Sequence, residues 1–198
     1  MSHGGGHGVV EGENKKIAIL ISILALFLAI AETLGKSAQT DGISYNVEAS
    51  NMWAFFQAKT IRKTTMETAA EQMEVDLKLG KDPATKDILE KRIKDWQSRS
   101  ARYESEPKLD KKGNNVGEGR RELMARALEA EKKRDVALAK YHNFEYGSAA
   151  FQIAIVLASS YLITGVLYLL WGALGVGGVG VFFVAMAILV PNFHLFGH

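Results

Sequence analysis

The sequence contains no cysteine and only three prolines, Pro83, Pro107 and Pro191. Without cysteine, the chain has no disulfide framework, no thiol chemistry and no thiolate-ligated metal. With so few helix breakers and so much alanine, leucine, glutamate and lysine, the composition favours helix throughout. The formal net charge is only +2, so nucleic acid is not an expected partner.

Charge is also missing from both ends of the chain. No Lys, Arg, Asp or Glu follows Glu145. Ahead of residue 35 the charged side chains are two basic and three acidic ones, at Glu11, Glu13, Lys15, Lys16 and Glu32. Residues 35–148 therefore hold 24 − 2 = 22 basic and 22 − 3 = 19 acidic side chains. Uncharged apolar runs flank this block, which predicts a membrane protein whose charged middle part stands in water.

The apolar runs predict three transmembrane helices, at residues 17–34, 149–171 and 179–196. A bilayer core needs roughly 20 helical residues. Residues 1–16 are interpreted as a flexible Gly/His tail, and the glycine-rich residues 172–178 as a tight turn between the last two spans. A signal peptide is the rival interpretation of the first span, but its apolar run is long and no good cleavage site follows.

The charged block, residues 35–148, reads as long helices joined by short breaks. Asp82 followed by Pro83 is a typical helix start, and residues 104–119 carry the glycines, asparagines and proline of a loop. From about residue 118 a helix continues directly into the second span. Three stripes at helical or heptad spacing support this reading. They are Met52, Phe56, Met66, Ala69, Met73 and Leu77; Leu89, Ile93, Trp96, Ser100 and Tyr103; and Leu123, Ala127, Ala130, Arg134, Ala137, Tyr141, Phe144, Ser148 and Phe151.

The predicted fold class is thus an all-α membrane protein. It has three transmembrane helices, with a long antiparallel helical or coiled-coil aqueous domain between the first and second. The aqueous domain has few large apolar side chains, so its core is thin. Pairing with another subunit would help to bury the stripes.

One segment carries a resemblance to a known family. Residues 48–62 read EASNMWAFFQAKTIR and follow closely on the first span. With that span and the C-terminal hairpin, this segment resembles a bacterial membrane-protein family, domain of unknown function 4337. The family has no assigned activity. The resemblance therefore implies the architecture and no catalytic residue.

Glu32 is the only acidic residue within a predicted span. A carboxylate in a bilayer is costly, which makes it a functional candidate by default. However, Glu32 is near the end of the apolar run, and Lys36 follows at the favourable i+4 position. An interfacial ion pair of Glu32 with Lys36 is the favoured interpretation over a proton or ion site.

A second candidate is an aromatic and basic cluster just beyond the first span. Its members are Trp53, Phe55, Phe56, Lys59, Arg62 and Lys63. These residue types suit contact with lipid headgroups, a partner, a substrate or RNA. Packing against the third helix near the membrane, with solvated basic groups, is the favoured interpretation.

Other patterns carry little chemistry. The segment from Gly175 to Gly180 matches GxGxxG, but no strand precedes it and no acidic residue follows, so dinucleotide binding is not expected. Four histidines (His3, His7, His194 and His198) lie in the tails and one, His142, ahead of the second span. No catalytic residue, metal site or cofactor is predicted, and the chain is not expected to be an enzyme.

The favoured function is a non-catalytic membrane-anchored helical scaffold or accessory subunit that self-assembles or joins a larger membrane complex. The alternative is an oligomeric transporter or channel component that uses Glu32. The expected partners are the lipid bilayer and other subunits. The expected location is the bacterial inner membrane, with several spans. Lys15 and Lys16 favour a cytoplasmic N-terminus and a periplasmic charged domain, whereas Lys132, Lys133, Arg134 and Lys140 favour the reverse.

Overall fold

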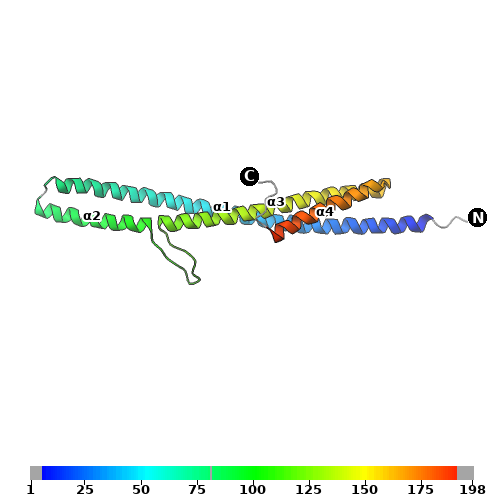
Figure 1. Ribbon diagram of the computed structural model, residues 1–198, viewed down its shortest axis with the longest axis horizontal. Helices are drawn as coiled ribbons and strands as arrows, with labels where there is room; N and C mark the ends of the chain where they lie inside the picture. Colours follow the sequence, from blue (N-terminus) through cyan, green and yellow to red (C-terminus); the bar gives the residue numbers. More distant parts are fainter. Residues whose placement is uncertain (1–5, 81, 191–198) are drawn as a thin grey trace, which may run out of the picture. The chain divides into compact units, whose positions relative to one another are not determined.

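The structure is a computed structural model that describes residues 6–80 and 82–190. Those residues form four helices (Figure 1): α1 (Gly6–Lys78), α2 (Pro83–Glu104), α3 (Arg120–Thr164) and α4 (Leu167–Leu189). Within the described ranges there is no β-strand, only an isolated bridge between Leu109 and Asn115. The prediction of an all-helical chain is confirmed.

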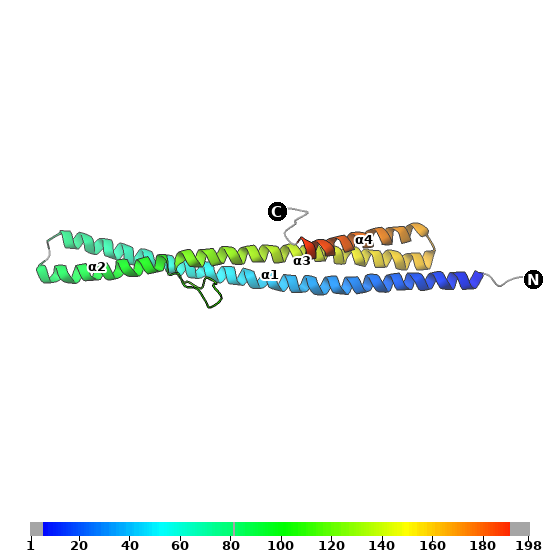
Figure 2. The ribbon, with the colours of Figure 1, turned by 60° about the horizontal axis from the view of Figure 1, so that its bottom comes forward.

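The helices pack into two compact units, residues 1–43 with 134–198 and residues 44–133. The charged unit, residues 44–133, is a hairpin of α2 and the end of α1, joined by a loop to the start of α3. In both ribbon views α2 lies beside the end of α1 (Figure 2). Most of its buried apolar side chains are alanines, at Ala49, Ala70, Ala127 and Ala130, and the larger ones are Ile93 and Leu123.

The turn between α1 and α2 has the predicted chemistry. Gly80 adopts a φ of +83°, a left-handed conformation that glycine reaches without steric cost. Asp82 then caps α2. Its Oδ1 accepts from the Thr85 amide at 3.1 Å, and its Oδ2 accepts from the Thr85 hydroxyl at 2.6 Å. Pro83 occupies the first turn, where its missing N–H costs nothing.

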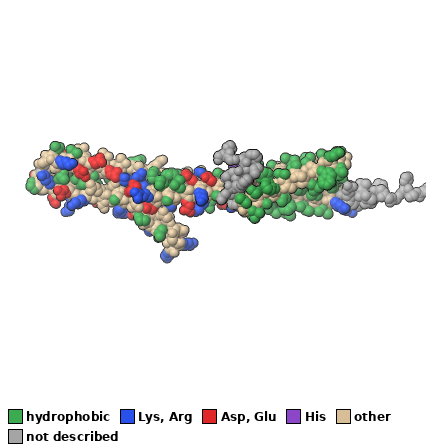
Figure 3. All heavy atoms as spheres, in the orientation of Figure 1, with side chains coloured by type: hydrophobic (Ala, Val, Ile, Leu, Met, Phe, Trp, Pro, Cys, Tyr) green, Lys and Arg blue, Asp and Glu red, His purple; other side chains and the backbone are tan. Residues whose placement is uncertain are grey.

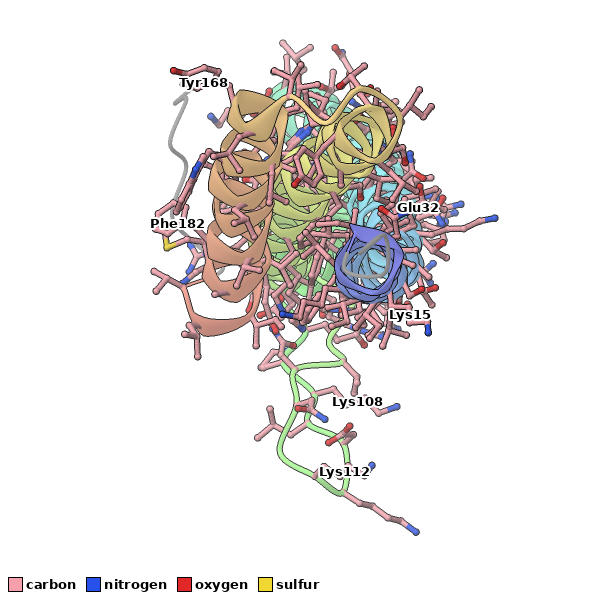
Figure 4. All side chains as sticks on the ribbon, turned by 90° about the vertical axis from the view of Figure 1, so that its right-hand side faces the viewer. Lys15, Glu32, Lys108, Lys112, Tyr168 and Phe182 are labelled. Atoms are coloured by element: carbon pink, nitrogen blue, oxygen red, sulfur yellow. The ribbon has the colours of Figure 1, made fainter. Side chains whose placement is uncertain are left out.

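The predicted loop after α2 is also present, between Glu104 and Arg120. Asp110 organises its tip by accepting hydrogen bonds from the amides of Lys112 and Asn114. Lys108 and Lys112 project from this loop, away from the helices (Figure 4). Glu122 in the first turn of α3 closes the base of the loop, because it accepts from the Ser105 hydroxyl at 2.6 Å and from the Glu106 amide at 3.1 Å.

The apolar unit contains the first part of α1, most of α3 and all of α4. Three helices are long and apolar enough to cross a membrane: α1, α3 and α4. Their centre is a cluster of Leu24, Ala31, Phe151 and Ala154, and Phe151 is completely buried. Hydrophobic side chains predominate on the face of this unit that Figure 3 shows.

The stripe predicted for α3 is the buried face of that helix. Leu123, Ala127, Ala130, Ala137, Phe144 and Phe151 are all buried. Helix α3 runs without a break from Arg120 to Thr164, as predicted. Arg134, the charged member of the stripe, bonds its neighbour Asp135 at 2.9 Å.

Two predicted boundaries were wrong. Residues 172–178 were expected to form a turn, but they lie inside α4, which begins at Leu167. The break comes instead at Gly165, whose φ is +69°. Helix α4 ends at Leu189, Val190 follows as its C-cap, and residues 191–196 of the span expected at 179–196 lie beyond the described residues.

The glycines of α4 serve close helix packing and not a turn. A Cβ at Gly180 would lie 2.8 Å from the ring of Phe151, and one at Gly177 would lie 3.1 Å from Leu24. Small residues let transmembrane helices approach closely. The glycines that were expected to form a turn therefore form a helix–helix contact.

The expected flexible tail is partly helical. Helix α1 begins at Gly6, so residues 6–16 belong to it, whereas residues 1–5 lie outside the described part. Extending an existing helix costs much less than nucleating one, so the long apolar run explains why α1 continues backwards through glycines.

Candidate functional site at the edge of the apolar unit

Glycines on α1 bring α1 and α3 together where the apolar run of α1 ends. A Cβ at Gly35 would lie 3.1 Å from the Phe144 Cβ, and one at Gly42 would lie 2.9 Å from the Leu138 side chain. Ala31 and Ala38 lie on the same buried face of α1. Because these side chains are so short, the backbones of α1 and α3 can approach each other closely.

A groove of about 480 Å³ lies along this contact. Its floor is formed by short or apolar groups, including Ala31, Gly35 and Phe144. Its rim is polar and charged, with Glu32, Lys36, Gln39, Tyr141, Glu145 and Gln152. The volume is within the range of small-molecule sites, roughly 300–1,000 Å³.

The structure gives Glu32 a partner that was not predicted. Gln152 Nε2 donates to Glu32 Oε1 at 3.2 Å, which links α3 to α1 across 120 residues of sequence. No ion pair joins Glu32 to Lys36 among the described residues, although both line the groove. Glu32 projects from the side of α1 away from α4 (Figure 4). The two candidate residues are therefore brought to one site but are not bonded to each other.

The other rim carboxylate, Glu145, is held on α3 by neighbours in its own helix. The Tyr141 hydroxyl donates to Glu145 Oε1 at 3.4 Å, and His142 Nδ1 lies 3.5 Å from Glu145 Oε2. The negative charge of Glu145, together with burial and this hydrogen bond, raises the pKa of Tyr141 above its usual value. The phenol is thus a neutral donor at the groove.

The predicted aromatic cluster divides into a packed part and an exposed part. Trp53 Nε1 donates to Glu131 of α3 at 2.9 Å, and the Trp53 ring meets Phe56 edge-on at 5.5 Å. The Arg120 guanidinium stacks over the Phe56 ring at 4.9 Å. These two aromatic residues therefore pack against α3, in agreement with the favoured interpretation.

The remaining members of the cluster face outward or pair within the charged unit. Phe55 is 59% exposed and lines a small pocket of about 180 Å³ with Met52 and Leu123. Lys59 lies 3.9 Å from Glu118 and sits over the Tyr103 ring. Arg62 is exposed. The structure does not gather these residues into a single binding surface.

A network of ion pairs near the loop stabilises the charged unit. Glu104 bonds Arg120 at 2.7 Å and Arg121 at 3.2 Å, and Lys63 lies 3.6 Å away. Burial opposes ionisation of Glu104, but the hydrogen bond from Arg121 and the charges of Arg120 and Lys63 outweigh it. The pKa of Glu104 is therefore below its ordinary value. The network fastens the end of α2 to α1 and α3.

Metal and nucleotide chemistry find no support in the described part of the chain. No group of three metal-ligating side chains occurs among its residues. The glycine-rich match at 175–180 is in the middle of α4, so its backbone amides are used within the helix. His3, His194 and His198 lie outside the described residues, and only the backbone of His7 is described.

The comparisons with known proteins identify a family and no activity. A sequence model of the family described as "Domain of unknown function (DUF4337)" matches residues 13–190. The chain belongs to this family. The match covers both compact units and confirms the resemblance carried by residues 48–62. No curated protein and no solved structure matches the chain.

Several residues that line the groove between α1 and α3 were not predicted from the sequence. Gln152, Tyr141 and Glu145 come from α3, far from Glu32 in the sequence. A polar residue within a span was the available signal for Gln152, but the pairing of α1 with α3 was needed to place it. Asn143 was also missed. It is buried, and its Nδ2 has no hydrogen-bond partner in the described part of the chain.

Proposed function

We propose that this DUF4337 protein is a non-catalytic membrane-anchored scaffold or accessory subunit that self-assembles or joins a larger membrane complex. The observation that carries the proposal is the thin core of the charged unit. Among its described residues, Ile93 and Leu123 are the only large aliphatic side chains that are buried. Several large apolar side chains of the same unit are exposed, including Phe55, Ile61, Val75, Leu79, Ile88 and Leu128.

Exposed apolar groups inside a bilayer are covered by lipid, but those of the charged unit face water. Burying apolar surface contributes roughly 25 cal/mol for each Å². Leu79, 74% exposed, and Ile88, 65% exposed, lie on either side of the α1–α2 turn. Contact with another subunit would bury these side chains and gain this free energy, which supports assembly as the function.

The absence of cysteine allows a direct test of assembly. A single cysteine at Phe55→Cys, in native membranes, is expected to react with a short bifunctional thiol cross-linker and give a dimer or a defined larger complex. Thr64→Cys is the matched control, because nine residues at 100° each place it on the opposite face of α1. Monomer alone from both variants would contradict the proposal.

For location, we propose the bacterial inner membrane, with α1, α3 and α4 as spans and the charged unit in the periplasm. Lys15 and Lys16 at the start of the first apolar run support a cytoplasmic N-terminus. An alkaline phosphatase fusion at Asn114 tests the orientation, because this residue lies in the exposed loop between α2 and α3. Active enzyme is expected, and inactive enzyme would reverse the orientation.

A second candidate function is a transporter or channel component that uses Glu32. It is favoured by the bond between Glu32 and Gln152, which places two polar side chains within the apolar unit. Proton or cation flux into liposomes, compared between the wild type and Glu32→Gln, tests it. A flux that Glu32→Gln abolishes would support this candidate, and an unchanged flux would remove it.

A further inference from the structure

We propose that the groove between α1 and α3 binds the zwitterionic headgroup of an aminophospholipid, a lipid that carries a primary ammonium and a phosphate. The proposal concerns the lipid specificity of the apolar unit. It does not depend on assembly through the charged unit. The observations that carry it are the charges of the groove, its position and the surface below it.

The groove contains a negative and a positive side chain that are not paired with each other and are available to a ligand. Glu32 bonds only Gln152, a neutral group, and Lys36 forms no ion pair among the described residues. A lysine four residues after a glutamate usually pairs with it. Here the carboxylate and the ammonium are both left for other partners.

A zwitterion matches this arrangement better than an ion of one sign. Two carboxylates, Glu32 and Glu145, line the groove and suit a primary ammonium, which has three N–H donors. Lys36 suits the phosphate, because its ammonium is the positive group among the lining residues. An anionic headgroup would meet two carboxylates, and a bare cation would leave Lys36 without a counter-charge.

A second polar groove of comparable size is different, because its charged residues already pair with one another. It measures about 530 Å³ and lies in the charged unit. Each of its basic residues already has an acidic partner: Lys59 with Glu118, Arg99 with Asp95 and Arg102 with Glu106. A ligand there would first have to break an internal ion pair. The groove beside Glu32 has no such cost at Glu32 and Lys36.

The position of the groove favours a lipid over a soluble molecule. Glu32 directly follows the apolar run of α1, and Glu145 directly precedes the apolar run of α3. The groove therefore lies where charged sequence gives way to apolar sequence on both of its helices. In a bilayer this is the depth of the headgroups.

A row of exposed residues with short side chains continues from the groove along α1. Four exposed residues with short side chains precede Glu32 on the same face of α1, at alternating spacings of four and three: Ala18, Ser22, Ala25 and Ala29. The Ser22 hydroxyl donates back to the Ala18 carbonyl at 2.9 Å, so its hydrogen-bonding donor is satisfied within α1. Val156, 63% exposed, lies one turn beyond Gln152 on α3. An acyl chain can lie along this row of short side chains while its headgroup occupies the groove.

Lipid retention in mixed bilayers tests the proposal. The full chain is reconstituted in vesicles of equal parts phosphatidylethanolamine, phosphatidylcholine and phosphatidylglycerol. It is then extracted in mild detergent, and native mass spectrometry counts the retained lipids. The wild type is expected to retain phosphatidylethanolamine about tenfold over phosphatidylcholine, because a trimethylated ammonium has no N–H to donate to a carboxylate. This ratio corresponds to about 1.4 kcal/mol.

Two variants separate the two charges of the headgroup. Glu32→Gln is expected to bring the ratio of phosphatidylethanolamine to phosphatidylcholine close to one. Lys36→Gln is expected to lower the retention of both lipids severalfold, because both carry the phosphate. The matched controls are Asp41→Asn and Lys16→Gln, on α1 but outside the groove, and neither should change retention. Circular dichroism and size-exclusion chromatography check that each variant is folded.

The proposal fails if the wild type shows no preference for phosphatidylethanolamine, or if Glu32→Gln keeps the full preference. Preferential retention of phosphatidylglycerol would also overturn it, because Lys36 alone would then dominate the site. A last experiment tests whether soluble glycerophosphoethanolamine competes with the retained lipid. If it displaced the lipid at equal concentration, the acyl chains would contribute nothing to binding, and the assignment to a lipid would be wrong.

Discussion

Replacing Gly180 with alanine tests whether α4 packs against α3 through its glycines. A Cβ at this position would lie 2.8 Å from Phe151 Cε1 and 3.1 Å from the carbonyl oxygen of Gly147. Phe151 is completely buried, so its ring has little free space to move into. The backbone oxygen could move away only if α3 moved with it.

The expected cost follows from this geometry. Adding a methyl group to a well-packed contact costs about 1–3 kcal/mol. Gly178 is the matched control, because it lies in the same helix and a Cβ there would meet nothing within 4 Å. Alanine is favoured over glycine in a helix by about 1 kcal/mol. This gain applies to both variants and cancels between them, so Gly180→Ala should be less stable than Gly178→Ala by about 1–3 kcal/mol.

Equilibrium unfolding in mixed micelles, followed by circular dichroism, measures this difference. Gly178→Ala is expected to be as stable as the wild type or slightly more stable. Equal stability of the two alanine variants would refute the packing of α4 through Gly180.

Three further predictions concern the charged unit. Trp53→Phe removes the hydrogen bond to Glu131 and should cost about 1 kcal/mol in denaturant unfolding, whereas Trp53→His, which keeps a ring N–H, should recover part of it. The pKa of Glu104 is lower in the folded chain than its ordinary 4.5. The stability that its bonds to Arg120 and Arg121 contribute is therefore present above about pH 4.5 and is lost as the pH falls through the folded pKa. The loss of stability on acidification should be smaller in Glu104→Gln. Gly119→Ala should lower the melting temperature more than any other glycine-to-alanine change in the loop, because its Cβ would overlap the backbone of Ser105 and Glu106.

The helices themselves could be predicted from the sequence, because their signals are local. The Asp82–Pro83 start, the glycine-rich loop and the stripe from Leu123 to Phe151 each depend on residues that are close in the chain. The structure bears these predictions out. The same local reasoning placed the turn after α3 wrongly, since glycine marks both turns and close helix contacts. Only the position of Phe151 opposite Gly180 distinguishes the two.

The groove could be predicted only in part. Glu32 and Lys36 were candidates because a charged side chain in an apolar run is conspicuous. Their predicted pairing was based on spacing along one helix. In the structure Gln152, on another helix, is the partner of Glu32. Spacing rules describe an isolated helix, and a neighbouring helix can offer a competing partner that they do not include.

The existence of the groove follows from the change in side-chain size along the buried face of α1. Near its start this face carries Leu24 and Leu28, which fill the space toward α3. At Ala31 and Gly35 the side chains shrink, so the floor beneath Glu32 and Lys36 is shallow and the charged rims stand above it. A Cβ at Gly35 would already press on Phe144, so a larger residue could enter only by separating the helices. The close approach of α1 to α3 and the open groove beside it therefore have the same cause, and Gly35→Leu should remove both. The change should separate the helices, occupy the floor of the groove and abolish any preference among lipid headgroups, while the helical content of α1 stays the same.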